Sequence, residues 1–327
     1  MNKSILIVSL SRLTNILNIF SISLLRLFKF KFSAREPIEI PKMLYRLGST
    51  QQEIPKKIWI YWDDVGNMPL LVEKCIEKIS YLNDDFEIIF LSENNIDYYI
   101  PTIHKFNFPK IQHKSDYIRL YLLSKYGGVW IDSSIIFYKP LDFFIKMMKE
   151  KKSNFFAFYN ERRTKDEEFP IIENWFLVAS RNHEFISYWL LEYEFALKIG
   201  ARNYIKFIGK NHPEFFHNID NSELDYMFNY ICAQKVLRKY SADYVFLSCD
   251  DTAFYYHYTG SWRFMLLGLK SFHYTNLIKT LTIFRKPKKN PILIKLVAGD
   301  RYQINSIILE KNYNNNTLLS EFLGDRK

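Results

Sequence analysis

Cysteine, glycine and proline are all scarce in this chain of 327 residues. The three cysteines (Cys75, Cys232 and Cys249) lie far apart and form no CxxC pair, which argues against a disulfide framework or a zinc site and fits a reducing compartment. Ten glycines and eleven prolines exclude a collagen-like chain or a long flexible linker. No run of about 20 uncharged apolar residues occurs, which excludes a polytopic membrane protein.

What the chain does contain is the composition of a folded protein. Hydrophobic residues make up 48% and charged residues 24%, so a sizeable core can form and global disorder is excluded. The length suffices for one large domain or two modest ones.

The net charge of +10 is unevenly distributed. Residues 1–32 carry five basic side chains and no acidic one, and residues 261–327 carry twelve basic and four acidic ones. The centre is therefore slightly acidic. Because both basic flanks are rich in Ile, Leu and Phe, and no nucleic-acid-binding motif is visible, the pattern favours an anionic membrane surface over nucleic acid as the partner.

The N-terminal flank has two possible interpretations. Residues 5–25 are apolar but are interrupted by Arg12, Asn15 and Asn18, which fits neither a secretory signal nor a spanning helix. We expect an amphipathic helix on the membrane surface or, as the alternative, a helix packed on the domain. Residues 33–53 are polar and predict a linker, so residues 1–53 form an amphipathic segment and linker.

Alternating short apolar runs and helical patterns predict an α/β domain over residues 54–260. In chain order we expect strands at 56–62, 86–92, 128–142, 154–159 and 174–180, and helices at 69–82, 113–127, 183–198 and 223–239. Ligands of such sheets bind beyond the carboxyl ends of the strands. The basic, amphipathic residues 261–327 predict a third region that contacts a membrane or an acceptor.

Two charged residues stand out in the apolar helix at 113–127. Asp116 and Arg119 are three positions apart and therefore share a face. Because a lone buried charge is costly, each needs a partner. Either they pair with each other as a structural element, or they border a polar pocket.

The next segment delivers an acid to the expected ligand edge of the sheet. Gly127 and Gly128 permit a tight turn and a close backbone approach to a ligand. The buried strand that follows ends at Asp132, and Ser133 and Ser134 add neutral oxygens. Oxygen ligands of this kind suit Mg²⁺ or Mn²⁺ bridging to phosphates. A single Asp after a strand is weak evidence by itself.

Four segments together resemble the capsular polysaccharide synthesis family. They are IPKKIWIYW (54–62), SDYIRLYLLSKYGGVWIDSS (115–134), NWFLVAS (174–180) and LDYMF (224–228). That family is a branch of the glycosyltransferases typed by the sugar-binding DxD motif, together with yeast-type α-mannosyltransferases and the clostridial glucosylating toxins. The resemblance covers about residues 54–230. It implies a GT-A fold with a Rossmann-like mixed sheet, flanked here by helical N- and C-terminal segments.

The resemblance also implies roles for individual residues. Trp62 matches the Trp that packs on the nucleotide base, and Asp116 and Arg119 match the pair that holds the donor ribose and sugar. Asp132 matches the first acid of DxD, but the third position is Ser134, so binding of Mn²⁺ or Mg²⁺ should be weaker or need another ligand, for which His273 is a candidate. The donor-binding set we expect comprises Trp62, Asp116, Arg119, Gly128, Asp132, Ser133, Ser134 and Asp225.

The resulting hypothesis is a bacterial glycosyltransferase. It would move a sugar from a nucleotide-sugar, such as a UDP-sugar, to a capsular or other surface polysaccharide, with a glycan or lipid-linked glycan as acceptor and with retention of anomeric configuration. Its place would be the cytoplasm, peripheral on the inner face of the cytoplasmic membrane. Two alternatives stay open: a sugar-1-phosphate transferase using the same donors, and a non-catalytic basic protein that binds membrane or nucleic acid.

Overall fold

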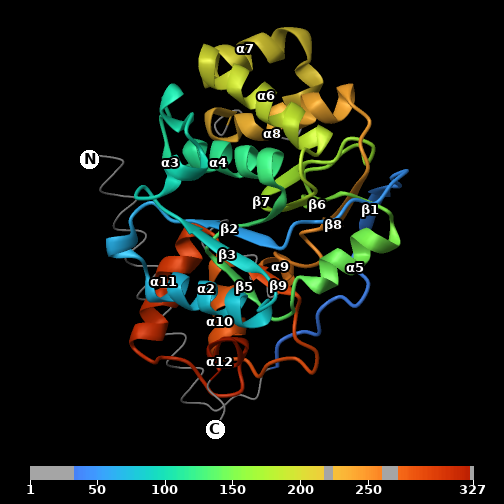
Figure 1. The fold of residues 1–327 in the computed structure, drawn as a ribbon. Coiled ribbons are helices and arrows are strands. Elements are labelled where there is room, and N and C mark those ends of the chain that lie inside the picture. The colour runs from blue at the N-terminus through green and yellow to red at the C-terminus, as the bar shows by residue number, and fades with distance from the viewer. Residues whose placement is uncertain (1–32, 217–223, 260–271, 325–327) are drawn as a thin grey trace, which may run out of the picture.

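The computed structural model describes residues 33–216, 224–259 and 272–324. Its centre is a seven-stranded mixed sheet with helices on both faces (Figure 1). The strand order is β1-β8-β6-β7-β4-β2-β3, formed by β1 (Met43–Arg46), β2 (Lys57–Tyr61), β3 (Glu87–Leu91), β4 (Gly128–Ile131), β6 (Phe155–Tyr159), β7 (Ile172–Ala179) and β8 (Tyr244–Ser248). The predicted α/β class is confirmed.

Strands β2, β3 and β4 run parallel to one another, as do β6 and β8, whereas β7 runs antiparallel to both β4 and β6. Strand β2 shows why this segment forms a central strand. Ile58 and Ile60 pack into the core on one face, whereas Trp59 and Tyr61 pack into the core on the other. Because alternate side chains point to opposite faces, an apolar run without polar alternation predicts a strand covered on both sides.

One face of the sheet is covered by the helices drawn at the top of Figure 1. They are α3 (Ile96–Tyr99), α4 (Ile111–Tyr126), α6 (Glu184–Ile199), α7 (Ala201–Asn211) and α8 (Leu224–Lys239). Short 3-10 turns span Val65–Asn67, Ile103–Lys105 and Pro213–Phe216. Helix α4 packs on β2, β4 and β7 and carries the predicted pair Asp116 and Arg119.

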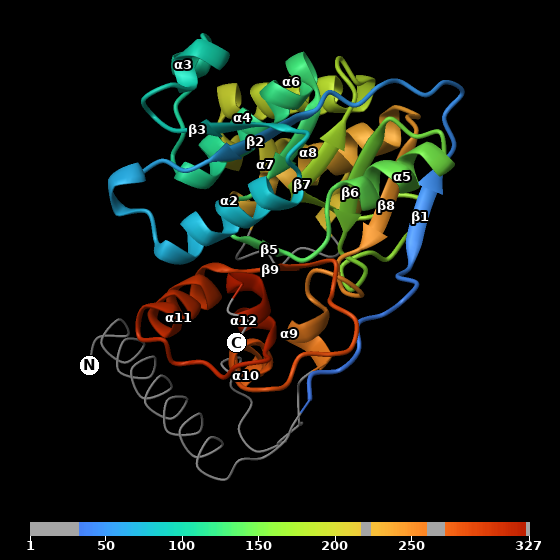
Figure 2. The ribbon, with the colours of Figure 1, turned by 60° about the horizontal axis from the view of Figure 1, so that its bottom comes forward.

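The opposite face is covered by α2 (Leu70–Leu82), α5 (Asp142–Glu150) and the C-terminal segment. That segment contributes α9 (Tyr255–Thr259), α10 (Phe272–Thr282), β9 (Leu293–Lys295), α11 (Ala298–Leu309) and α12 (Leu318–Leu323). Figure 2 shows this group lying below the sheet beside α2. A small two-stranded sheet joins β9 to β5 (Ile135–Phe137), which follows directly after the predicted motif.

Both predicted flanks differ from expectation where they are described. The expected linker contributes the edge strand β1, which pairs with β8. The C-terminal segment shares a core with α2 and β5, formed by residues such as Leu71, Ile136 and Ile304, so the predicted boundary at residue 260 does not separate it from the domain. None of the helices within the described ranges is both long and apolar enough to cross a membrane.

Gly127 and Gly128 have positive φ angles of 66° and 99°. A Cβ at Gly128 would lie 2.5 Å from the Lys57 carbonyl oxygen, and a Cβ at Gly127 would lie 2.6 Å from the Arg181 nitrogen. The close backbone approach that we expected toward a ligand is therefore made to neighbouring strands and turns of the chain itself. The pair of glycines ends α4 and lets β4 enter the sheet beside β2.

Candidate active site

A cleft of about 420 Å³ opens at the edge of the sheet where β2 and β4 end. This volume lies within the range of roughly 300–1,000 Å³ that is typical of small-molecule sites. Its lining combines aromatic rings with charged groups: Tyr61, Trp62, Asp63, Ser115, Asp116, Arg119, Asp132, Ser133, Ser134, Glu173, Asn174, Trp175, Tyr230, Lys295 and Arg301 are among the residues that form it.

Strand topology explains why distant residues meet there. Trp62 follows β2 and Asp132 follows β4, and parallel neighbours end at the same edge. Strand β7 runs the opposite way, so its first residues, among them Asn174, reach that same edge. The Asp132 backbone N–H donates to the Trp175 carbonyl at 2.9 Å, which fixes Asp132 beside the beginning of β7.

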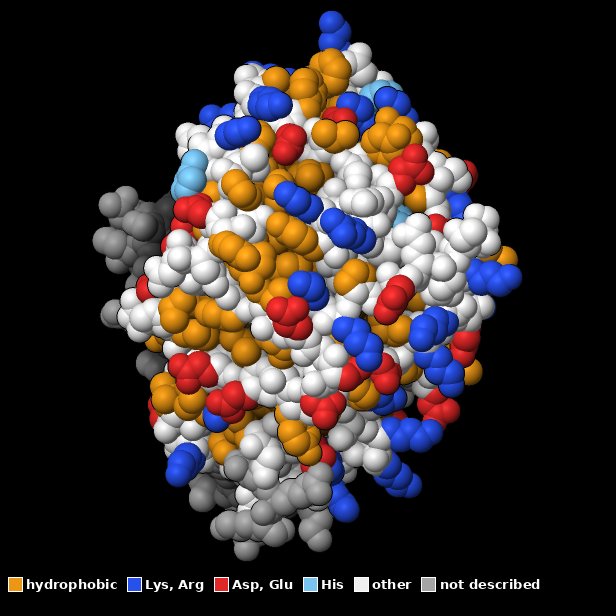
Figure 3. Space-filling view, viewed as in Figure 1, with side chains coloured by type: hydrophobic (Ala, Val, Ile, Leu, Met, Phe, Trp, Pro, Cys, Tyr) orange, Lys and Arg blue, Asp and Glu red, His pale blue; other side chains and the backbone are white. Residues whose placement is uncertain are grey.

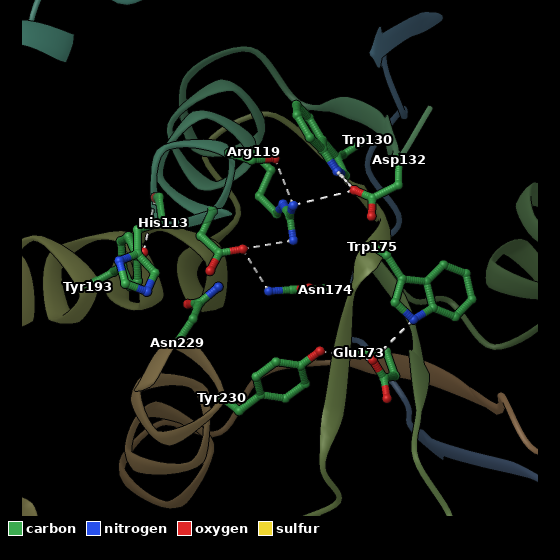
Figure 4. Close-up of polar contacts among 12 residues, drawn as sticks. His113, Arg119, Trp130, Asp132, Glu173, Asn174, Trp175, Tyr193, Asn229 and Tyr230 are labelled. Atoms are coloured by element: carbon green, nitrogen blue, oxygen red, sulfur yellow. Dashed lines mark hydrogen bonds and ion pairs between the residues drawn. The ribbon is translucent and has the colours of Figure 1, made fainter. Parts of the chain in front are cut away.

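Arg119 connects the helix to the sheet across the cleft. Its Nη1 lies 2.9 Å from Asp116 Oδ1, and its Nη2 lies 3.3 Å from Asp132 Oδ1. Figure 4 shows this guanidinium reaching from its helix toward Asp132, to which Trp130 Nε1 also donates at 3.0 Å. Asn174 Nδ2 donates to Asp116 at 3.0 Å. Both interpretations of the predicted pair therefore hold: the two residues are ion-paired, and they border a polar cleft.

The two carboxylates differ in their acidity. Burial raises the pKa of Asp116 to about 6, although Arg119 opposes the shift. Burial would also raise the pKa of Asp132, but Lys295 and Arg119 outweigh it and hold the pKa of this carboxyl below its usual range. Asp132 is thus kept ionised, whereas Asp116 takes up a proton more readily.

Lys295 comes from the C-terminal segment, and its place in the site was not predicted. Its Nζ lies 2.7 Å from Asp132 Oδ2, and its side chain is only 11% exposed. Strand β9 pairs Lys295 with Ile135, three residues after Asp132, so the small sheet carries the ammonium into the cleft. A lone Lys inside the apolar run PILIKLV needs a partner by the argument applied to Arg119, and this signal could have found it.

Glu173 is a second acid that the sequence analysis missed. It lies at the beginning of β7 and is 7% exposed. It accepts hydrogen bonds from Trp175 Nε1 at 3.1 Å and the Tyr230 hydroxyl at 3.0 Å, both drawn in Figure 4, and from Asn160 Nδ2 at 2.9 Å. Burial raises its pKa in spite of these donors. The ring of Trp175 stacks on Phe158 and also lines the cleft.

The structure brings most of the predicted donor-binding residues together. Trp62, Ser133 and Ser134 line the cleft with Asp116, Arg119 and Asp132. Gly128 is not among the cleft residues, because it stands at the start of β4 and Asp132 follows its end. Two further predicted residues, Asp225 in α8 and His273 in α10, have side chains that lie outside the described part of the structure.

The residues at the motif do not fit the predicted divalent cation. Both Asp132 oxygens already meet cationic or N–H donors, with Lys295 at Oδ2 and Arg119 at Oδ1. Ser134 is 2% exposed, and its hydroxyl is directed to the Leu296 carbonyl at 3.5 Å. A hard cation needs several oxygen ligands, and here one carboxylate is shared between two positive side chains. Within the described ranges, no three His, Cys, Asp or Glu residues are grouped to hold a metal.

Comparison with known proteins identifies the segment that carries this site. Residues 42–196 match the family described as capsular polysaccharide synthesis protein, which confirms the predicted resemblance over that range. The O-glycosyltransferase braB of Annulohypoxylon truncatum is 29% identical over 154 residues, 41% of this chain and 36% of that protein. The glycosyltransferase afumC of Aspergillus fumigatus is 26% identical over 150 residues, 41% of this chain and 38% of that protein. The chain thus spans little more than a third of the length of these fungal relatives.

Two solved structures show a low similarity to this chain. The PaToxG glycosyltransferase is 14% identical with a TM-score of 0.34, covering 57% of this chain and 79% of its own. An active-site mutant of LgtC is 8% identical with a TM-score of 0.35, covering 82% of this chain and 99% of its own. The description of the fold as a mixed α/β sheet rests on the strand pairing itself.

Proposed function

Since residues 42–196 match the capsular polysaccharide synthesis family, and the relatives that share this segment are glycosyltransferases, we propose that the protein transfers a sugar from a nucleotide-sugar to a glycan. The observation that carries the proposal is the cleft at the end of β4, where Asp132, Arg119 and Asp116 form one connected polar system. A GT-A arrangement of the donor at the carboxyl ends of β2 and β4 is part of the proposal.

The cleft offers separate groups for the separate parts of such a donor. Trp62 presents an indole ring for the base, and Arg301 flanks it with its guanidinium 5.7 Å from the ring centroid. Asp116, fixed by Arg119 and Asn174, can accept hydrogen bonds from ribose or sugar hydroxyls. Cations from α4 and from the C-terminal segment face the place where a diphosphate would lie.

The chemistry needs support for a departing diphosphate. The bond between the anomeric carbon and the phosphate oxygen breaks, and its electron pair leaves with that oxygen. The acceptor hydroxyl oxygen forms the new bond to the anomeric carbon, and its proton passes to the departing phosphate oxygen. Positive side chains that are already fixed in a partly buried cleft stabilise this growing negative charge. Attack on the same face would retain the anomeric configuration, and NMR of the product anomer tests this part.

The charge of the face drawn in Figure 3 does not favour the non-catalytic alternative. On that face, basic, acidic and hydrophobic side chains of the described residues are intermixed. A polyanion-binding surface would need a continuous stripe of one sign. Two lysines of the basic run 285–289 are also ion-paired, Lys286 with Glu321 and Lys289 with Glu39.

Location at the inner face of a bacterial cytoplasmic membrane, and a surface polysaccharide as product, also belong to this proposal. The basic and apolar composition of residues 1–32 supports membrane contact. These residues lie outside the described part of the structure. The family description supports the capsular polysaccharide as the product class.

A screen of the purified protein against nucleotide-sugars tests the proposal. We expect release of the nucleoside diphosphate from one donor, accelerated by a glycan acceptor. Release of the nucleoside monophosphate instead would identify a sugar-1-phosphate transferase. No turnover of any donor, combined with salt-sensitive binding to polyanions, would favour the non-catalytic alternative.

A further inference from the structure

The cationic side of the cleft supports an inference that rests on the proposed function and deepens it. We propose that Lys295, held by Asp132, supplies the positive charge that meets the donor diphosphate, so that this chain binds and transfers without a divalent cation. The motif would then act through an ion pair, and the missing second carboxylate at Ser134 would be matched by a lysine from the C-terminal segment.

The position of Lys295 is fixed by backbone pairing as well as by charge. The Lys295 backbone N–H donates to the Ala253 carbonyl at 3.1 Å, and the neighbouring Leu296 N–H donates to the Ser134 carbonyl at 3.2 Å. Strand β9 is buried throughout, and Lys295 is 9% exposed as a residue. Its ammonium is therefore held at the cleft by strand pairing on one side and by the Asp132 carboxylate on the other.

Two further groups make this side of the cleft positive. Arg301 lines the cleft from α11, and no described carboxylate lies within ion-pair distance of it. Arg119 is 5% exposed, and its Nε has no hydrogen-bond partner among the described residues. A buried, unpartnered donor is costly unless a ligand satisfies it. Val297 and Ala298, at the N-terminus of α11, also line the cleft, but the Val297 backbone N–H already donates to the Asp300 carboxylate at 3.0 Å.

The ion pairs of the cleft explain why Asp132 would still be essential for binding the diphosphate. Arg119 is shared between Asp116 and Asp132, whereas Lys295 is paired with Asp132 alone. Over the whole cleft lining, the three cations Arg119, Lys295 and Arg301 stand against four acids, Asp63, Asp116, Asp132 and Glu173. The positive charge is therefore local, where Lys295 and Arg119 meet at Asp132. Asp132 acts as a positioning residue, because it holds both Lys295 and Arg119 at one carboxylate.

The test is the binding of inorganic pyrophosphate and of UDP and GDP, measured by calorimetry in excess EDTA and again with Mn²⁺. Wild-type protein is compared with Lys295→Met, which removes the charge, and Lys295→Arg, which keeps it. Lys286→Met is the matched control, because Lys286 belongs to the same segment but does not line the cleft. Its Nζ lies 2.7 Å from Glu321. Thermal unfolding of each variant confirms that it is folded.

We expect wild-type protein to bind pyrophosphate and at least one nucleotide in EDTA, with less than a twofold gain from Mn²⁺. Lys295→Met should weaken pyrophosphate binding at least tenfold, Lys295→Arg by less, and Lys286→Met not measurably. Binding that requires Mn²⁺, or a folded Lys295→Met variant that binds like wild type, would overturn the inference. Lysine-dependent pyrophosphate binding without turnover of any nucleotide-sugar would remove the proposed function and leave the anion site standing.

Discussion

Replacing Asp116 by Asn should make the protein more stable at neutral pH while impairing its function. The reason is the buried position of this carboxyl, which raises its pKa to about 6 from an ordinary value of 3.8. Between these pH values the folded protein keeps a proton that the unfolded chain has lost. Folding stability therefore falls as the pH rises through this window, and a shift of about two units corresponds to about 3 kcal/mol.

The Asp116→Asn side chain does not ionise, so the folding stability of this variant should not fall over the same pH range. Its amide can accept from Arg119 or Asn174 as the protonated acid does, and Arg119 keeps its contact with Asp132. The unfolding free energy of Asp116→Asn minus that of the wild type should therefore grow with pH. Integration of the same shift gives an increase of roughly 1.5 kcal/mol between pH 5 and pH 7.5.

Urea unfolding followed by tryptophan fluorescence at pH 5, 6 and 7.5 measures this difference. Asp84→Asn, an exposed substitution in the loop after α2, controls for the change of side chain and should alter stability by less than about 0.5 kcal/mol. A difference that stays constant, or that shrinks as the pH rises, would refute the reasoning. Donor turnover by Asp116→Asn should fall at every pH, since the carboxylate that accepts sugar or ribose hydroxyls is gone.

Three other predictions concern the turn, the base site and the N-terminal flank. Gly128→Ala should lower the unfolding free energy by more than about 2 kcal/mol, since its Cβ would lie 2.5 Å from the Lys57 carbonyl oxygen. Gly200→Ala, also at positive φ but with open space around it, should lower the unfolding free energy by less in the same urea titration. Equal losses in the two variants would contradict the steric argument. Trp62→Ala should weaken nucleotide binding by about 1–3 kcal/mol if its ring stacks on the base, and an unchanged dissociation constant would remove that role. Deletion of residues 1–32 should abolish sedimentation with anionic vesicles, and a truncated protein that still sediments would place the membrane contact elsewhere.

Local pattern was enough to predict the centre of the fold. The strands β2, β3, β6 and β7 and the helices α2, α4, α6 and α8 follow from apolar periodicity, because each buries one stripe or both faces against its neighbours. The motif residues on α4 and after β4 were found for the same reason. Isolated charges in apolar segments need partners, and Arg119 is the partner of both Asp116 and Asp132.

What the sequence did not reveal depends on pairing between distant segments. Lys295 and Asp132 are 163 positions apart, and no local signal shows that β9 pairs with β5. One side of the C-terminal segment packs on α2 and β5, which the amphipathic pattern alone did not reveal, and its predicted membrane or acceptor contact stays a prediction. The edge strand β1 escaped detection because its burial is partial and shows no alternation. Glu173 was missed, although a lone acid in an apolar strand carries the same signal as Arg119.

The central claim is that the carboxylate at the end of β4 organises the binding of an activated sugar. The most direct test is donor turnover by wild-type protein and by Asp132→Asn, measured side by side as nucleoside diphosphate released, with circular dichroism to confirm that both are folded. We expect Asp132→Asn to lose nearly all turnover, because Lys295 and Arg119 lose the carboxylate that fixes them. Turnover of Asp132→Asn at the wild-type rate would contradict the account.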